Sequence, residues 1–446
     1  MSEARVWLSV ERDRWRPLVP ANTHSPLQTE AGAGVWPLLI VLSAVLLNAG
    51  LAVVNAHIVP LSANAVIGAE VLVVVAAHVV VLANYRPQMF PWYALIVIIV
   101  LFSLERAVVV GQFDPKFLRD ALLIPTFVLL GMTTSPRRLT ALVVFLHVIV
   151  VGGVLFEAFF TQAYSNLFDV KQYYIATRSL DVSDFFNKSS DLFVSATRPG
   201  ERFFSLIDLH RTSSVLLEPV SLGNYVIIVT AFLCANSKRM SWKVSAFLLM
   251  GNFVSLIGCD GRLAAVLSVV IILIAMVATW LPWKSALLYL PLTLVGAVAF
   301  VVLAHPDVAD NFPGRVAYGI DLLARYDLLD WFGNSDRLVV DAADSGIAYT
   351  ITTQSVIGLA AFWCFLVLNA KEQTPEQVKY LHAVCIYLAL SMLVSYSLFS
   401  IKTAALLWFI YGSFQMASRP SPIAPRAARE RVASSIHAQL GPRLAW

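Results

Sequence analysis

The feature that most constrains this chain is a series of apolar runs, each about 20 residues long, that recur along almost its whole length. A hydrocarbon core about 30 Å thick is crossed by roughly 20 helical residues. Composition agrees, since 58% of the residues are hydrophobic, 13% are charged and the mean hydropathy is +0.73. The runs lack the apolar-polar alternation of barrel strands, and backbone polar groups must pair internally in lipid. The sequence therefore predicts an all-α, polytopic integral membrane helix bundle.

The runs predict about twelve transmembrane helices within a membrane domain over residues 35–417. The expected spans lie near 35–55, 64–84, 91–110, 117–133, 139–162, 213–235, 242–259, 262–281, 284–304, 344–369, 380–398 and 401–417. Polar tails are predicted on either side of this domain, over 1–34 and 418–446. Two intervening segments, 163–212 and 305–343, are too long to be simple connectors.

The distribution of Lys and Arg predicts the orientation of the spans, because short cytoplasmic loops are enriched in these residues. Basic residues fall in the two tails and in alternate short loops, at Arg86, Arg137, Arg138, Lys238, Arg239, Lys243, Lys284, Lys371 and Lys379. We therefore expect both termini in the cytoplasm and both long loops on the external, periplasmic side. This topology distributes the charged residues between the two sides of the membrane. The net charge of +4 therefore gives no indication of nucleic-acid binding.

Function is expected at the external face, because long ordered loops are usually lids or binding loops. Each long loop has apolar residues at spacings that suit one helix face. These are Val182, Phe185, Phe186 and Phe193 in the first loop, and Val316, Ile320, Leu323 and Leu329 in the second. Such a helix could lie in the membrane interface or pack on the bundle, and the sequence leaves both open.

The first candidate group of functional residues is "HRTSSVLLEPVSLGNY", at the start of the sixth predicted span. Arg211 and Glu218 are seven residues apart, which on a helix gives one face and roughly 10 Å along the axis. A carboxylate inside an apolar run is costly unless it is paired or faces a wet cavity. Pro219 predicts a kink just after it. The alternatives are that Glu218 pairs with a neighbouring span and that Arg211 reaches lipid headgroups.

Two further groups are predicted at the external membrane boundary. In "GCDGRLAAV", Arg262 begins a span, where its guanidinium suits phosphate, although it could be a topology anchor. In "DAADSGIAYT", Asp344 and Ser345 precede a span and either one could simply cap it. The functional alternative is a carboxylate at the boundary, with Tyr349 one turn further in. Arg337, in "GNSDRL", is another possible anion contact.

Several kinds of site are not indicated. No GxSxG, HExxH, P-loop or dinucleotide motif occurs. The histidines have no ligand spacing, and the four cysteines have no CxxC pair. We therefore expect no metal site, no cofactor and no disulfide. His210 lies beside Arg211 and could titrate in a site, but a solvated loop histidine is the simpler interpretation.

The architecture and three short motifs together resemble the bacterial Wzy-type polysaccharide polymerases and O-antigen ligases, especially the exopolysaccharide polymerases of Gram-negative bacteria. The motifs are "RTSSVLLEPVSLGNY", "DGRLAAVLS" and "DSGIAYTITTQSVIGLAAF". About twelve spans, a large external loop before a span that opens with Arg, and another before a late span are typical of that family.

The resemblance implies metal-independent glycosyl transfer at the periplasmic face of the bacterial inner membrane. A polymerase would join oligosaccharide repeat units carried on undecaprenyl pyrophosphate into exopolysaccharide or O-antigen. Arg211 and Arg262 would stabilise the pyrophosphate leaving group, and Glu218 or Asp344 would act as the base for the acceptor hydroxyl. A repeat-unit flippase and a chain-length regulator are the partners that the family implies.

Two other functions stay open. An O-antigen ligase would use the same lipid-linked donor with a different acceptor. The ligases of the family commonly have a His in the late external loop, whereas residues 306–343 contain none. A lipid-linked sugar flippase or another transporter would account for a polar cavity without catalysis, but it should have ionisable groups near mid-bilayer.

Overall fold

The structure is a computed structural model that describes residues 34–178, 180–198, 202–204, 210–309 and 311–416. Within these ranges every regular element is a helix and no strand occurs. Residues 1–33 of the predicted N-terminal tail and the whole predicted C-terminal tail lie outside the described residues. An all-helical fold is therefore confirmed for the described part of the chain.

The long helices follow the apolar runs of the sequence. In the first half they are α2 (Trp36–His57), α3 (Ala63–Ala83), α4 (Phe90–Val110), α5 (Pro115–Gly131) and α6 (Pro136–Phe159). In the second half they are α9 (Pro219–Asn236), α10 (Trp242–Cys259), α11 (Arg262–Val277), α12 (Tyr289–Ala304), α15 (Gly346–Leu368), α16 (Pro375–Ser391) and α17 (Ile401–Gln415).

Eight helical segments of the described chain are long and apolar enough to cross a membrane. They contain α2, α3, α4, α6, α9, α10, α12 and α15. The helices α5, α11, α16 and α17 occupy the other predicted spans but are only 15 to 17 residues long. A multi-pass helical membrane protein is thus confirmed, while twelve crossings stay a prediction.

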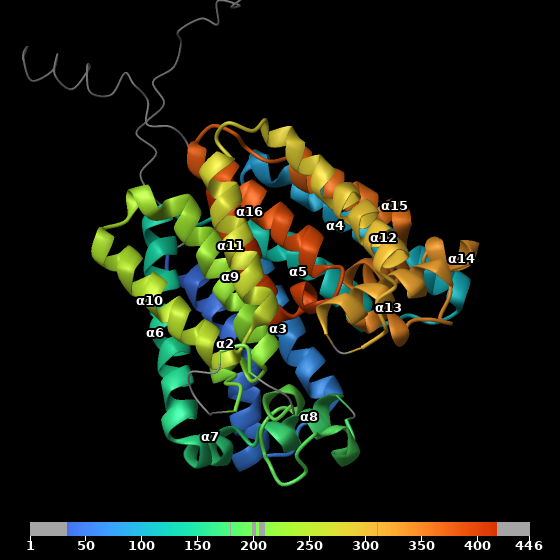
Figure 1. Cartoon of the computed structure of the whole chain (residues 1–446). Helices are drawn as coiled ribbons and strands as arrows, with labels where there is room; N and C mark the ends of the chain where they lie inside the picture. The colour runs from blue at the N-terminus through green and yellow to red at the C-terminus, as the bar shows by residue number, and fades with distance from the viewer. Residues whose placement is uncertain (1–33, 179, 199–201, 205–209, 310, 417–446) are drawn as a thin grey trace, which may run out of the picture.

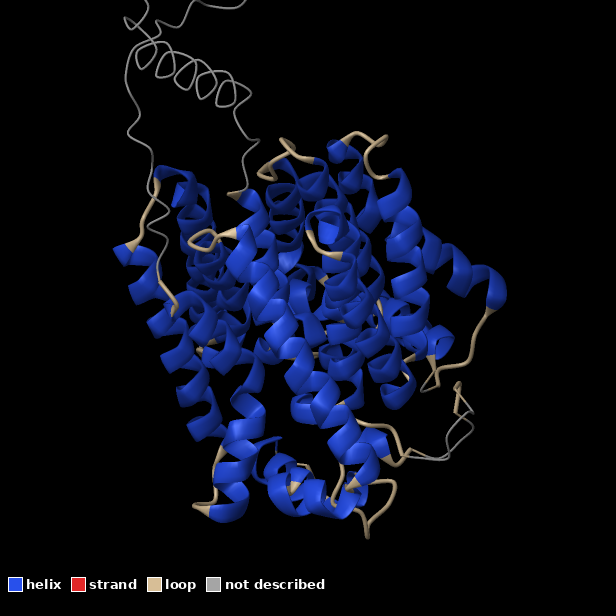
Figure 2. Ribbon diagram, turned by 90° about the vertical axis from the view of Figure 1, so that its left-hand side faces the viewer, coloured by secondary structure: helices blue, strands red, loops and turns tan. Residues whose placement is uncertain are grey.

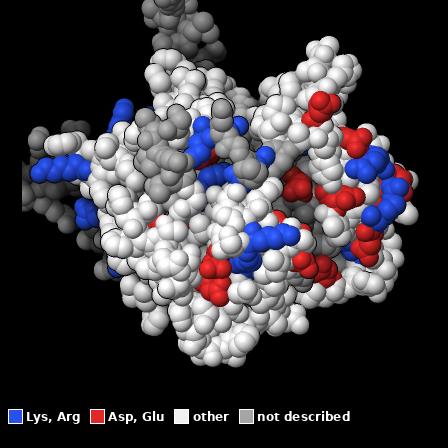
Figure 3. All heavy atoms as spheres, turned by 60° about the horizontal axis from the view of Figure 1, so that its bottom comes forward, with Lys and Arg blue, Asp and Glu red and all other residues white. Residues whose placement is uncertain are grey.

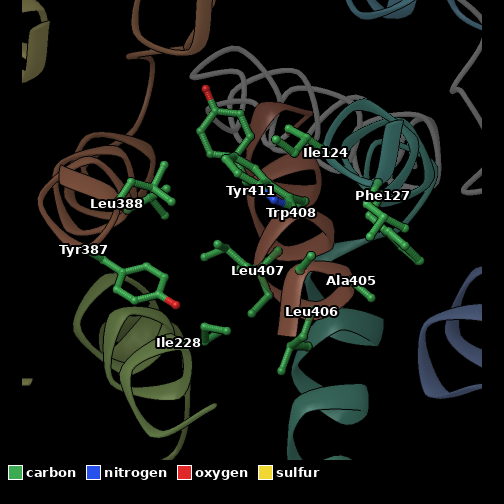
Figure 4. Close-up of a cluster of buried hydrophobic side chains, with 14 of the residues drawn as sticks. Ile124, Phe127, Ile228, Tyr387, Leu388, Ala405, Leu406, Leu407, Trp408 and Tyr411 are labelled. Atoms are coloured by element: carbon green, nitrogen blue, oxygen red, sulfur yellow. The ribbon is translucent and has the colours of Figure 1, made fainter. Parts of the chain in front are cut away.

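The centre of the bundle is formed by α17, which packs along α5 and also contacts α2 and α9. Every residue of α17 is buried. Figure 4 shows how Trp408 and Tyr411 of α17 lie among Ile124 of α5 and Leu388 of α16. In contrast, α3 and α12 have many exposed leucines and valines, as expected for helices that face lipid.

Two glycines allow α5 and α17 to approach each other closely. A Cβ atom added to Gly412 would lie 2.0 Å from the carbonyl oxygen of Val128, and one added to Gly131 would lie 2.1 Å from that of Phe409. Small residues commonly allow such backbone contacts between membrane helices, where van der Waals packing drives association. The α5–α17 contact is important for the site, because both helices carry buried charges near their N-termini.

The long segments between α6 and α9 and between α12 and α15 extend from the bundle as short helices. Figures 1 and 2 show α7 (Thr161–Phe168) and α8 (Val170–Arg178) across its lower end. The second segment contains α13 (Phe312–Ala324) and α14 (Leu328–Trp331), at the right-hand side in Figure 1. Which side of the membrane this end faces stays a prediction.

The helix expected in the first long segment is not formed, whereas in the second Val316, Ile320 and Leu323 lie in α13 and Leu329 lies in the separate helix α14. Residues 182–184 and 194–196 are isolated 3-10 turns. The side chains of Asp181 and Asn187 accept hydrogen bonds from the backbone of Ser183 and Ser189, and such local bonds compete with a helix. In α13, Val316 is buried and Gly319 lies against the carbonyl of Leu393, so this helix packs on the bundle.

We predict that Gly412→Ala and Gly131→Ala each destabilise the protein, because the added methyl group would collide with backbone of the facing helix. Overpacking of this kind typically costs about 1–3 kcal/mol. Gly152→Ala is the matched control, since nothing lies within 4 Å of a Cβ at that helical position. Thermal unfolding in detergent would measure the difference, and equal midpoints for Gly412→Ala and Gly152→Ala would contradict the described packing.

Candidate functional site

Residues 210–218 link the loop region to α9, and their conformation differs from the one expected. The segment holds a 3-10 turn at Ser214–Leu216, and α9 begins at Pro219 with Glu218 as the N-cap residue. The prediction that Arg211 and Glu218 share a helix face is therefore wrong, as is the predicted kink at Pro219. Proline at the first helical position costs nothing, because its missing N–H would have no intrahelical partner.

Glu218 lies in a cluster with two cations, Arg178 and Lys402. Its Oε1 atom is 2.6 Å from Nη2 of Arg178, at the end of α8, and 2.9 Å from Nζ of Lys402, near the start of α17. Ser221 donates a hydrogen bond to Oε2 over 2.9 Å. Lys402 is fully buried and also donates to the carbonyl of Leu216 over 2.8 Å. We name Glu218, Arg178 and Lys402 the Glu218 cluster.

These contacts determine the charge state of Glu218. Burial alone would raise the pKa of the carboxyl group, but the charges of Arg178 and Lys402 outweigh burial and hold that pKa well below its ordinary value. A carboxylate that remains ionised and paired with two cations is a weak proton acceptor near neutral pH. The contacts thus favour an electrostatic role for Glu218 over the role of general base.

A second buried cluster, the Asp120 cluster, consists of Glu70 of α3 and Arg119 and Asp120 of α5. Arg119 forms ion pairs with both carboxylates, at 2.6 Å to Oδ1 of Asp120 and in close contact with Glu70. Tyr349 of α15 donates a hydrogen bond to Oδ2 of Asp120 over 2.5 Å. The predicted ligand-binding residue Tyr349 is thus buried and its hydroxyl is paired inside the bundle.

The two clusters complement each other in charge. The Glu218 cluster has one positive charge in excess and the Asp120 cluster has one negative charge in excess. Arg178 and Lys402 act electrostatically on Glu70, so the two clusters lie within interaction range. Charges of both clusters act electrostatically on Tyr396. The Nζ atom of Lys116 lies 5.6 Å from the centroid of the Tyr396 ring. One buried polar network thereby joins α3, α5, α8, α15, α17 and the start of α9.

Arg211 lies outside this network, on the C-terminal end of α10. Its Nε atom donates to the carbonyl of Cys259 over 3.0 Å, and Arg202 donates to the carbonyl of Ile257 over 2.9 Å. Arg262 begins α11 three residues later and is exposed. Burial, together with the charges of Arg198 and Arg202, lowers the pKa of Arg211. We name Arg202, Arg211 and Arg262 the arginine group.

His210 is paired with a buried carboxylate, Glu157 of α6. Its Nε2 atom is 3.2 Å from Oε1 of Glu157, which is completely buried. The other oxygen, Oε2, accepts hydrogen bonds of 2.7 Å from the backbone N–H groups of Ser213 and Ser214. The interpretation of His210 as a solvated loop histidine is therefore wrong, because one of its ring nitrogens has a fixed partner.

The other two predicted residues, Arg337 and Asp344, have separate surroundings, although Asp344 acts electrostatically on Tyr396 of the network. Arg337 pairs with Asp330 of α14 and lies 3.5 Å from Asp327, so its partners are within its own loop. Asp344 ends the 3-10 turn Asp341–Asp344 and is exposed. Ser345 caps α15 by accepting a hydrogen bond from the N–H of Ala348, as the capping interpretation expected.

Charged side chains are frequent at the end of the bundle that carries α7 and α8. Figure 3, which brings this end forward, shows acidic and basic side chains in mixed groups among other residues. In the described ranges, no three His, Cys, Asp or Glu side chains gather in a way that could hold a metal ion. The arrangement therefore offers cations and carboxylates for binding and proton transfer.

Sequence reasoning missed most of the buried network, including Lys402, Arg178 and the adjacent pair Arg119 and Asp120. One signal was available for Lys402, which is a single cation within a long apolar run. An ionisable residue inside a membrane segment is by default a candidate functional residue. No sequence signal could have paired it with Glu218, since 184 positions separate the two in the numbering.

We predict that Glu218→Gln destabilises the protein by about 3–5 kcal/mol, the usual cost of leaving a buried charge without its partner. Adding Lys402→Met should recover part of this loss, because it removes the fully buried cation. Asp321→Asn is the control, since its ion pair with Arg325 is exposed and should contribute at most about 1 kcal/mol. Unfolding midpoints in detergent would test this, and additive effects of the two cluster substitutions would contradict it.

Comparison with known proteins adds no family assignment: no family model, no curated protein and no solved structure matches this chain.

Proposed function

We propose that this protein is a metal-independent glycosyltransferase that polymerises lipid-linked oligosaccharide repeat units at the periplasmic face of the bacterial inner membrane. Its substrate would be a repeat unit on undecaprenyl pyrophosphate. The growing chain would leave its lipid pyrophosphate and join the sugar of the next lipid-linked unit. The observation that carries the proposal is the arginine group, which concentrates positive charge at one end of a membrane bundle.

The arginine group has the properties that a pyrophosphate leaving group requires. Negative charge develops on the leaving oxygen, and donors that are already in position stabilise it without a cost of reorganisation. Arg211 is held by the carbonyl of Cys259 and, over 3.3 Å, by that of Ser195. The neighbouring hydroxyl groups of Ser195 and Thr212 are buried, with no hydrogen-bond partner among the described residues. A bound phosphate would give these hydroxyl groups an acceptor.

The buried polar network would support this site rather than perform the chemistry. Its residues come from α3, α5, α8, α15 and α17 and hold the lower ends of these helices together. Tyr396 adjoins Tyr349, with ring centroids 5.2 Å apart, and both are near Lys116. These ring contacts pack the network inside the bundle, where Tyr349 is buried.

A transporter or lipid-linked sugar flippase is the second candidate, and two observations favour it. Buried ionisable groups lie on helices of the bundle at Glu70, Asp120 and Lys402. Helix α15 is interrupted at Ser355, whose φ is 65°, and the nearby carbonyl of Thr352 accepts a hydrogen bond from Arg106 over 3.1 Å. Interrupted helices and internal charges are common at transport sites.

The test is to express wild type, Arg211→Ala and Arg262→Ala at matched membrane levels in a strain that lacks the protein, and to analyse the lipid-linked glycans. We expect each substitution to reduce polymer formation by about 10²–10³-fold, the range seen when a positioned transition-state donor is removed. Single repeat units should then accumulate on the outer leaflet. Arg239→Ala is the control. Its ion pair with Glu376 joins the C-terminal end of α9 to the N-terminal end of α16, away from the arginine group.

Each alternative has its own outcome. Units that stay on the inner leaflet in the null strain would indicate a flippase. Polymer that forms normally but is not attached to its acceptor would indicate a ligase. Normal polymer in both arginine variants, or the same loss in Arg239→Ala, would contradict the proposed role of the arginine group.

A further inference from the structure

We infer that Glu157 and His210 form an acid–base dyad in which His210 takes the proton from the acceptor hydroxyl group. This inference rests on the proposed glycosyl transfer and deepens it, because Glu218 is occupied by two cations and Asp344 lies apart from the arginine group. Neither residue of the dyad was assigned a role from the sequence. Their geometry and their place in the chain carry the inference.

The carboxylate of Glu157 is fixed in position by its surroundings. Both Ser213 and Ser214 donate their backbone N–H groups to Oε2, and Ser214 also donates its hydroxyl to the carbonyl of Val150 over 2.6 Å. No part of Glu157 is exposed. These bonds leave Oε1 directed at His210 at 3.2 Å. A buried carboxylate that orients an imidazole ring is the arrangement that many enzymes use to position a general base.

The pairing also selects the tautomer of His210. A carboxylate accepts and does not donate a hydrogen bond, so Nε2 carries the proton in the neutral ring. The other nitrogen, Nδ1, is then an acceptor that bonds to none of the described residues, as a general base requires. When Nδ1 takes a proton, the adjacent carboxylate of Glu157 stabilises the imidazolium ion.

The dyad lies beside the arginine group because residues 210–214 are held between α6 and the end of α10. Arg211 donates its backbone N–H to the carbonyl of Ala196, and Thr212 donates to that of Gly258. The guanidinium of Arg211 contacts the next carbonyl along α10, that of Cys259. A base and a phosphate-binding cation therefore occupy neighbouring positions in the chain. In the proposed reaction, the attacked anomeric carbon is one oxygen atom away from the phosphate.

Nδ1 of His210 accepts the proton of the acceptor sugar hydroxyl, and the oxygen forms a bond to the anomeric carbon of the growing chain. The bond between that carbon and the pyrophosphate oxygen breaks, and the lipid pyrophosphate leaves with the electron pair. The arginine group stabilises the added negative charge. The imidazolium ion then releases its proton to solvent or to the departing lipid pyrophosphate.

A purely structural role is the alternative, in which Glu157 only fastens the loop to α6. Two substitutions separate the roles. In Glu157→Gln, the amide oxygen can still accept from Ser213 and Ser214, but the amide nitrogen faces Nε2 of His210 and favours the other tautomer. In His210→Gln, the side chain keeps an N–H donor for Glu157 and loses the base.

The experiment uses the purified full-length protein in proteoliposomes, with lipid-linked repeat units extracted from the null strain as the probe. We expect His210→Gln and Glu157→Gln to lower kcat by about 10²–10⁴-fold, the usual contribution of general acid–base catalysis, with KM little changed. Imidazole should restore part of the activity of His210→Ala. His57→Gln is the matched control, because this exposed histidine also makes one bond, to the carbonyl of Leu167, and should retain the wild-type rate.

The outcomes distinguish the inference from the function on which it rests. A wild-type protein that forms no glycosidic linkage would overturn the proposed function itself. An active wild type together with a His210→Gln variant that keeps more than half of its rate would overturn the dyad alone. Loss of activity in His210→Ala that imidazole does not restore, or a Glu157→Gln effect confined to KM, would also overturn it.

Discussion

A charge inside an apolar helix bundle needs an opposite charge close by, because removing it from water without a partner costs several kcal/mol. The pairing of Glu218 with Arg178 and Lys402 meets this requirement at the point where α8, α9 and α17 converge. Lys402 has no access to water, so its position fixes that of Glu218. The excess positive charge of this cluster is balanced by the excess negative charge of Glu70, Arg119 and Asp120.

This balance determines how the loop region is attached to the membrane bundle. Arg178 is the last residue of α8, and its ion pair ties that short helix to the start of α9. The nine residues before α9 then have a fixed end, and Glu157 holds their middle by accepting two backbone N–H groups. His210 and Arg211 precede these attachments and have contacts of their own, with Glu157 of α6 and with the carbonyl of Cys259 at the end of α10. In the proposed reaction, these contacts would hold the cation and the base in position.

The sequence predicted the elements of the fold well and the contacts of the site poorly. Apolar runs predicted helices at twelve places, and helices lie there, because the period and length of a run reflect the medium around it. Arg211 and Glu218 were placed on one helix face because they are close in the chain. In the structure, Arg211 contacts the carbonyl of Cys259, and Glu218 pairs with Arg178 and Lys402. No local pattern encodes contacts between helices that are distant in sequence. The buried partner of His210 was missed for the same reason, since Glu157 lies 53 residues away in the sequence.

The most direct test of the account is a stoichiometric measurement on purified protein in proteoliposomes that are supplied with lipid-linked repeat units. Glycosyl transfer from a lipid pyrophosphate predicts that one lipid pyrophosphate is released for each glycosidic linkage formed, with no requirement for a nucleotide sugar. Movement of intact units across the bilayer, with neither linkage formation nor pyrophosphate release, would contradict the account and establish transport as the function of the buried charges.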